Sequence, residues 1–120
     1  MLGARWVQKE ILAKDSSIDL RVYAIWFNMY PGDKRSRWNP KRISDPRVMH
    51  YWDEKKIVGK WLVDQQIVDY PDEILWDAYL LFGPEASWNE TLRTLNTWGR
   101  PVYPDRKRLA ASLKELLGLI

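Results

Sequence analysis

The chain contains no cysteine, only two phenylalanines and a single histidine among its 120 residues. Without a thiol it forms no disulfide, no thiolate metal site and no cysteine nucleophile, so redox chemistry by its own thiols is excluded. No apolar run approaches the ~18–20 residues of a membrane-spanning helix, so we expect no membrane partner. The N-terminus lacks the basic, apolar and small-residue sections of a signal peptide, which favours a cytoplasmic location.

The charge of the chain is nearly balanced. Nineteen basic residues face 16 acidic ones, a net charge of +3. This small excess makes nucleic acid a possible partner but does not favour it. A length of 120 residues fits one domain, 1–120, with a core of moderate size.

The first half of the chain predicts a helix and then a buried strand. Apolar residues spaced by three and four indicate a helix over Met1–Lys14. The segment Asp19–Asn28 is apolar at both alternate sets of positions beyond Val22. A strand that is apolar on both faces is typical of an α/β sheet covered by helices.

Two interpretations fit residues 45–66. Asp45-Pro46 has the residue types of a helix N-cap followed by proline at the first helical position, and an apolar stripe continues to about Gln66. This pattern favours a second helix, which Gly59 weakens by up to about 1 kcal/mol relative to alanine. The alternative is a hairpin that turns at residues 53–56.

The last part of the chain predicts strands followed by a helix. Ile74–Phe82 has the composition of a second buried strand, and Ser87-Trp88 is a candidate hairpin partner. Arg100–Tyr103 is a candidate short edge strand, because proline suits an edge position. Pro104-Asp105 begins a final helix whose apolar face consists of Leu109, Leu113, Leu116, Leu117 and Ile120.

Several motifs resemble segments of a group of thioredoxin-like proteins. They are Gly3-Ala4-Arg5-Trp6-Val7-Gln8, Asp45-Pro46-Arg47-Val48, His50-Tyr51-Trp52-Asp53, Val58-Gly59-Lys60-Trp61 and the run Trp76–Pro84. In those proteins a strand and a Cys-x-x-Cys motif precede the first helix. The resemblance implies an α/β fold with a small central sheet, helices on both faces and the first strand missing. With no redox cysteine, it carries no catalytic residue over to this chain.

The expected loss of the first strand has a physical consequence. In a thioredoxin-like sheet that strand lies beside the segment that here is 20–28, so its loss exposes an apolar edge. Such edges recruit another chain or another segment of the same chain. We therefore expect a homodimer, formed by strand pairing or by an exchanged element, with an interface near Trp6, Val22, Ala24 and Trp26. The alternative is a monomer whose own loop or tail covers the edge.

Basic residues next to aromatic residues give two candidate ligand sites. Trp38 directly follows Arg37 and lies close to Arg35, a pattern that suits stacking on bases, sugars or a protein partner. The simpler interpretation is that Trp38 anchors its loop while the arginines stay solvated.

The second candidate lies at the start of the final helix. Arg106 and Arg108 place positive charge on the first turn, where the helix dipole disfavours it. Together with Arg100 they suggest a phosphate or carboxylate site. The simpler interpretation is that Asp105 offsets the charge.

Catalytic patterns are weak in this sequence. On a helix, His50 and Asp53 would share one face, but two ligands are too few for a metal site, so a structural role for the histidine is the simpler interpretation. We find no glycine-rich phosphate loop and no serine elbow. The sequence therefore favours a non-catalytic module that binds proteins or small molecules, with no cofactor.

Two other functions remain open. One is a nucleic-acid or polyanion binder, whose candidate residues are Lys34, Arg35, Arg37, Trp38, Lys41 and Arg42. The other is a hydrolase or metal site around His50 and Asp53.

Overall fold

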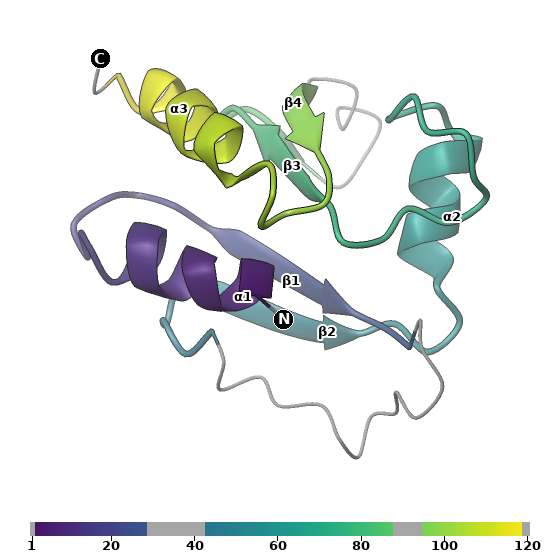
Figure 1. The fold of residues 1–120 in the computed structure, drawn as a ribbon, viewed down its shortest axis with the longest axis horizontal. Helices are drawn as coiled ribbons and strands as arrows, with labels where there is room; N and C mark the ends of the chain where they lie inside the picture. The colour runs from purple at the N-terminus through teal and green to yellow at the C-terminus, as the bar shows by residue number, and fades with distance from the viewer. Residues whose placement is uncertain (1, 29–42, 88–94, 119–120) are drawn as a thin grey trace.

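The fold is a small α/β arrangement of three helices and two small sheets, drawn in Figure 1 from a computed structural model that describes residues 2–28, 43–87 and 95–118. The described elements are α1 (Leu2–Trp6), η1 (Val7–Leu12), β1 (Val22–Trp26), β2 (Val48–Trp52), α2 (Ile57–Asp64), β3 (Tyr79–Phe82), β4 (Leu95–Gly99) and α3 (Arg106–Leu116). The radius of gyration is 14.2 Å, close to the roughly 13.6 Å of a compact chain of this length. The predicted α/β class is confirmed.

The first helix is confirmed, although its second half has an unusual geometry. α1 continues directly into η1, a π-helix in which the Ala13 amide donates to the Gln8 carbonyl at 2.9 Å, five residues back. The helix ends at Leu12, which is fully buried. Its last turn therefore supplies the centre of a hydrophobic cluster.

Residues 45–66 differ from both predicted interpretations. Val48–Trp52 form β2, which pairs in parallel with β1 in the register Val22↔Val48 to Trp26↔Trp52. The predicted helix is wrong over this segment, and the hairpin is wrong too because the strand partner lies earlier in the chain. Side chains in this segment alternate between more buried and exposed positions, as in a strand. The spacing of Val48, Tyr51 and Trp52 also fits one face of a helix, which is why the sequence favoured a helix.

The helix in this region begins later than predicted. α2 starts at Ile57, and the two Asp53 carboxylate oxygens accept hydrogen bonds from the amides of Ile57 and Val58 at 2.9 and 2.8 Å. Asp53, and not Asp45, therefore satisfies the free amides at the start of the helix.

The second sheet is antiparallel. β3 pairs with β4 from Tyr79↔Gly99 to Phe82↔Leu95, with an irregularity beside Phe82. The predicted strand over 74–82 is confirmed in its second half. Of the predicted hairpin partner, Ser87 lies outside any strand and Trp88 lies outside the described residues.

The predicted edge strand at Arg100–Tyr103 is wrong. These residues form turns, in which the Asp105 amide donates to the Pro101 carbonyl and the Arg106 amide to that of Tyr103. The Val102 amide donates to an Asp77 carboxylate oxygen and not to a neighbouring strand. The final helix, predicted from Pro104-Asp105, is confirmed as α3.

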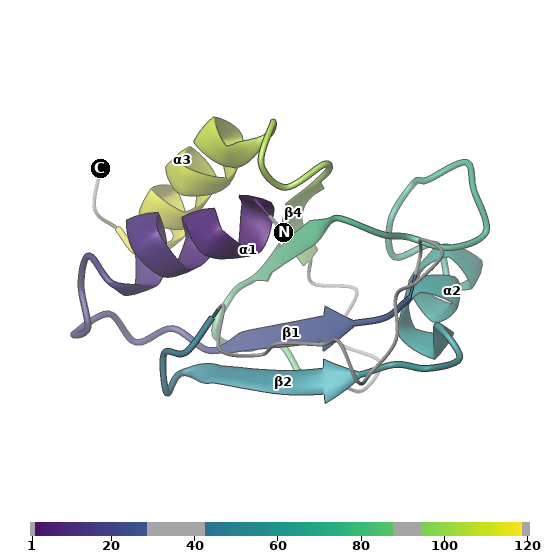
Figure 2. The same cartoon turned by 60° about the horizontal axis from the view of Figure 1, so that its bottom comes forward.

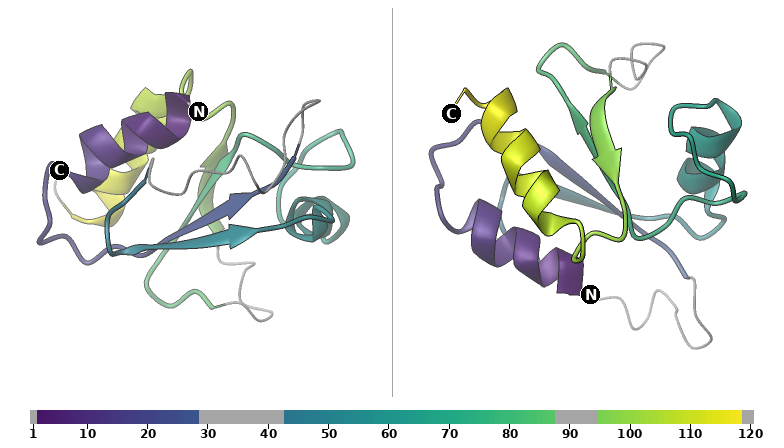
Figure 3. Two further views of the ribbon diagram at one scale, coloured as in Figure 1. Left: turned by 90° about the horizontal axis from the view of Figure 1, so that it is seen from below. Right: turned by 45° about the horizontal axis from the view of Figure 1, so that its top comes forward.

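The strands do not form the single central sheet that we expected. Within the described ranges, β1–β2 and β3–β4 are separate two-stranded sheets. Figures 2 and 3 show the first helix close to α3, whereas α2 lies at the opposite end of the molecule from α3. The core is divided accordingly, because one cluster gathers Leu12, Ile43 and Val48 and another gathers Leu62, Val68 and Leu75.

The two faces of the β1–β2 sheet differ in the contacts that the described residues make. Val22, Ala24 and Trp26 pack against the cluster around Leu12. On the opposite face Tyr23 is 39% exposed, and the other exposed apolar residues are Met49 at 52% and Tyr51 at 44%. The expectation of a strand buried between two layers is therefore wrong for this second face.

Gly59 allows α2 to approach the neighbouring chain closely. A Cβ atom at this position would lie 2.7 Å from the Leu75 carbonyl oxygen, and the Leu75 amide donates to the Gly59 carbonyl at 3.3 Å. The glycine that weakens the helix locally is thus required by packing against residues 74–75.

Gly59→Ala should destabilise the protein although alanine has the higher helix propensity. Overpacking against a backbone carbonyl destabilises the folded state by about 1–3 kcal/mol. The higher helix propensity of alanine stabilises it by only roughly 1 kcal/mol. Urea unfolding followed by circular dichroism measures the difference. A stabilised Gly59→Ala variant would contradict the close packing.

Candidate functional site

Arg100, Arg106 and Arg108, the arginines predicted to bind an anion, contact other residues of the chain. The Arg100 guanidinium stacks over the rings of Tyr70 and Trp76, at 5.2 and 5.1 Å from their centroids, and its Nε donates to the Trp76 carbonyl. Each such contact stabilises by about 0.5–2 kcal/mol. Arg100 therefore holds the segment before β3 against the end of β4.

Arg106 and Arg108 have separate partners. Arg106 lies 4.1 Å from the Tyr103 ring centroid and donates to the Tyr103 carbonyl, whereas Arg108 donates to Thr97 Oγ1 and to the Trp98 carbonyl. No contact among the described residues gathers the three predicted arginines around one point. The remaining predicted site residues, Arg35, Arg37 and Trp38, lie outside the described residues.

A carboxylate already faces the basic residues at the start of α3. Asp105 lies 3.8 Å from Arg108 Nη1 and accepts a hydrogen bond from the Tyr79 hydroxyl at 2.6 Å. Burial and this hydrogen bond raise the pKa of Tyr79 to about 12. The local charge is therefore offset within the chain, as in the simpler of the two interpretations of this segment.

The residues predicted for a dimer interface have contacts within the chain. The side chains of Val22, Ala24 and Trp26 pack on the cluster around Leu12, and Trp6 is half-buried in the first helix. On the opposite face of this sheet, Tyr23, Met49 and Tyr51 are exposed.

His50 occupies a structural position in β2. Trp26 Nε1 donates to His50 Nδ1 at 3.0 Å, and His50 Nε2 lies 2.8 Å from the Ile43 carbonyl oxygen. Because a carbonyl only accepts, Nε2 carries the proton and Nδ1 is the acceptor. The predicted sharing of a helical face by His50 and Asp53 is wrong, since His50 lies in a strand and Asp53 in the turn before α2.

Among the described residues, the Arg47 side chain donates hydrogen bonds to several segments of the chain. Its Nη1 donates to the carbonyls of Asp15 and Ile18, and its Nη2 donates to that of Leu12. Nε and Nη2 also bind the two Asp45 carboxylate oxygens, each at 2.8 Å. All five guanidinium N–H groups thus have an acceptor.

Asp45 is held charged by this arrangement. Hydrogen bonds from the guanidinium and from the Arg47 amide lower the pKa of Asp45 to about 2. The sequence offered one signal, an acid and a base two residues apart around Pro46, which we interpreted as a helix start. Their actual role is to join β2 to the end of the first helix.

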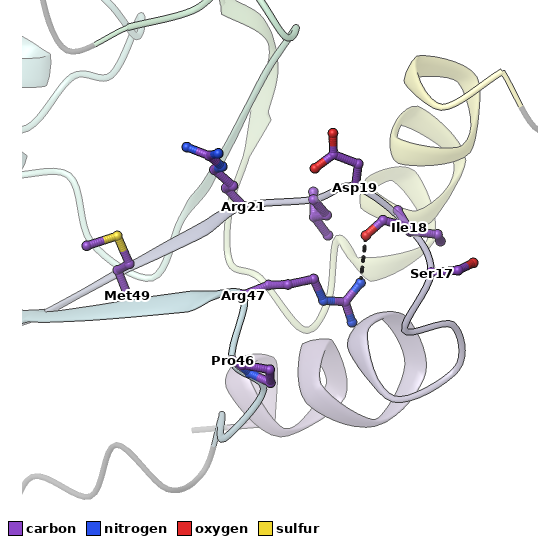
Figure 4. A pocket seen from close by; sticks show the side chains of 8 residues that line it. Ser17, Ile18, Asp19, Arg21, Pro46, Arg47 and Met49 are labelled. Carbon is purple, nitrogen blue, oxygen red and sulfur yellow. Dashed lines mark hydrogen bonds between the residues drawn. The ribbon is translucent and has the colours of Figure 1, made fainter.

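A cavity of about 480 Å³ lies beside Arg47, at the beginning of β1 and β2. Its lining residues are Ser17, Ile18, Asp19, Leu20, Arg21, Pro46, Arg47 and Met49. Figure 4 shows that Asp19, Arg21 and Met49 point away from the first helix, whereas Arg47 turns toward Ile18. The cavity therefore opens on the exposed face of the sheet, where Met49 also lies.

Two further properties of the described residues bear on function. In residues 2–28, 43–87 and 95–118, no three His, Cys, Asp or Glu side chains are placed to hold a metal ion together. Within the same ranges, no helix has the length and apolarity needed to cross a membrane.

Comparison of the chain with family models, with curated proteins and with solved structures finds no match.

The Arg47 contacts should dominate the stability of the first sheet. Arg47→Lys leaves an ammonium that cannot reach all the acceptors of the planar guanidinium, and should lower the free energy of unfolding by about 2 kcal/mol. Asp45→Asn should also destabilise at neutral pH. Its deficit relative to wild type should shrink as the pH falls from about 4 to about 2, because the wild-type carboxylate is then protonated.

Chemical denaturation between pH 7 and pH 2 measures both effects. Asp64→Asn, at an exposed position at the end of α2, is the matched control and should leave the free energy of unfolding at pH 7 close to that of the wild type. A deficit for Asp45→Asn that stays constant down to pH 2 would contradict the pairing.

Proposed function

We propose that this chain is a non-catalytic interaction module that self-associates through its β1–β2 sheet. The observation that carries the proposal is a parallel two-stranded sheet with one covered face and one face that exposes Tyr23, Met49 and Tyr51. Parallel sheets are almost always covered on both faces, and two strands alone are marginally stable in water. A second chain supplies the missing cover.

The edge of β1 that points away from β2 provides a second route to association. β2 is the strand partner of β1 among the described residues. In a strand, the backbone N–H and C=O groups of successive residues point to opposite edges. The backbone groups of Ala24 point toward β2, whereas the amide of Ile25 points away from β2. An edge of this kind accepts an additional strand.

A thioredoxin-like origin remains part of the proposal. It rests on the motifs of the sequence, whereas the observed order differs from the expected one because β2 precedes α2. The sequence motifs specify such a fold better than any activity.

The alternative, a nucleic-acid or polyanion binder, draws less support. Its loop residues lie outside the described residues, and Arg100, Arg106 and Arg108 have partners within the chain. Binding to single-stranded nucleic acid that weakens steeply with salt would favour this alternative.

The proposal predicts a dimer in solution. Light scattering coupled to size exclusion, run over a hundredfold range of concentration, should give twice the 14.3 kDa mass of the chain. The apparent mass should fall toward that of the monomer at the lowest concentrations, as mass action requires. A mass of one chain throughout would refute self-association.

Hydrogen exchange distinguishes the two routes. If the sheets associate through their faces, the Ile25 amide should exchange much faster than those of Ala24 and Trp26, which face β2. If β1 instead pairs edge to edge with a second β1, Ile25 should become protected in the dimer. NMR measures the exchange rates of these three amides at protein concentrations below and above the dimer dissociation constant, and so distinguishes face-to-face from edge-to-edge association.

A further inference from the structure

We propose that His50 is a proton-sensitive contact, which holds the Trp26 indole while its ring is neutral and releases that indole when its ring is protonated. The observations that carry this proposal are two hydrogen bonds of one half-buried ring, to Trp26 and to Ile43. His50 is the single histidine of the chain, and histidine is the side chain whose charge ordinarily changes between pH 5 and 8. The device acts within one chain and does not depend on the proposed self-association.

The two ring nitrogens of His50 are used in opposite senses. Trp26 Nε1 donates to His50 Nδ1 at 3.0 Å, and His50 Nε2 lies 2.8 Å from the Ile43 carbonyl oxygen. An indole N–H only donates and a carbonyl only accepts, so these bonds require a lone pair on Nδ1 and a hydrogen on Nε2. The two rings are 22° from parallel, an orientation in which the in-plane lone pair of Nδ1 meets the indole N–H. The neutral Nε2–H form of the ring therefore satisfies both partners.

Protonation breaks one of these bonds and keeps the other. The added proton binds Nδ1, which becomes a donor that faces the N–H of Trp26. Two donors form no hydrogen bond, so the indole loses its acceptor. Nε2 still donates to Ile43, now from a charged ring, and charge-assisted hydrogen bonds are the stronger kind. Because the gain at Ile43 offsets the loss at Trp26, the proton moves a side chain within the folded state and does not unfold the protein.

The described charged groups on the neighbouring elements are exposed or already bound. β1 carries no charged side chain from Val22 to Trp26, and the first helix packs against this side of the sheet with apolar residues. The charged residues of α1 and η1, all exposed, are Arg5, Lys9 and Glu10. Near Ile43, the pKa of Asp45 is held at about 2 by its bonds to Arg47, so Asp45 does not change charge between pH 8 and 5.

The remaining charged neighbour is Asp53, just beyond the end of β2. Its carboxylate accepts hydrogen bonds from the Ile57 and Val58 amides at the start of α2. Among the charged and titratable side chains described around this contact, a histidine is the type that ordinarily changes charge between pH 8 and 5.

The position of Trp26 determines what its release affects. Trp26 is the last residue of β1, and its side chain packs against the cluster around Leu12. Its carbonyl accepts a hydrogen bond from the Asp53 amide at 2.7 Å, and Asp53 in turn binds the first amides of α2. The released indole therefore belongs to the residue at which the end of β1, this cluster and the turn before α2 meet. Loosening of this junction at acidic pH is the expected consequence.

An NMR titration of the wild-type protein from pH 8 to pH 5 tests the proposal. The ¹⁵N shifts of the imidazole report the proton on each ring nitrogen, and a single histidine gives one set of signals. Once His50 is protonated, the Trp26 indole N–H should exchange with solvent about fivefold faster relative to that of Trp61, the factor that corresponds to one neutral hydrogen bond. Trp61, 38% exposed on α2, is the reference that cancels the intrinsic pH dependence of exchange. Trp26→Phe assigns the Trp26 signal.

Two variants of His50 separate its two hydrogen bonds. His50→Asn keeps an acceptor near the position of Nδ1 and does not titrate, so the Trp26 indole should stay protected at both pH values. His50→Gln keeps a donor near the position of Nε2 for the Ile43 carbonyl but offers no acceptor at Nδ1. In this variant the Trp26 indole should exchange fast at both pH values. The wild-type titration decides by itself if a variant fails to fold.

Release of the Trp26 indole in step with the protonation of His50, and its absence in His50→Asn, is the expected result. Unchanged protection of Trp26 while His50 titrates would overturn the proposal, as would a ring that stays neutral down to pH 5. A wild-type pH dependence that persists in His50→Asn would overturn it too, because another group would then control Trp26. Faster exchange of the Leu113 amide in α3 over the same range would report unfolding of the whole protein and would also contradict it.

Discussion

The Arg47 guanidinium is the interaction on which the first half of the structure depends. It binds carbonyls at the end of the first helix and in the segment before β1, while its other side pairs with Asp45 just before β2. A planar group with five fixed donors can satisfy several acceptors from different segments at once. Because parallel strands cannot be joined by a tight turn, β1 and β2 are not held together by a short loop. The Arg47 hydrogen bonds instead connect the segments that precede the two strands.

The division of the core explains why this connection matters. One cluster centres on Leu12 and another on Leu62, and the two sheets do not share a strand within the described residues. Few side chains are deeply buried, so the hydrophobic contribution to stability is spread over two small groups. Polar contacts that join segments therefore contribute more than they would in a domain with one large core.

The predicted ligand-binding arginines that the structure describes also contribute to the fold. Arginines near tryptophan suggested a ligand site, yet Arg100 stacks between Tyr70 and Trp76 and Arg106 stacks on Tyr103. Stacking of a guanidinium on a ring stabilises a fold by the same electrostatics with which it would bind a ligand. Composition cannot distinguish the two uses, because the partner of each arginine is distant in sequence or set by a turn.

The sequence by itself determined the α/β class, the first helix, β1 and α3, because these depend on the periodicity of neighbouring side chains. It misassigned Val48–Trp52, where the spacing of Val48, Tyr51 and Trp52 fits a helix and the alternation of the segment fits a strand. Only the tertiary structure decided between them, through pairing with β1 and through the Trp26–His50 hydrogen bond. The role of Arg47, the division into two sheets and the open face with its cavity were likewise decided by contacts between residues far apart in the chain, which no local pattern records.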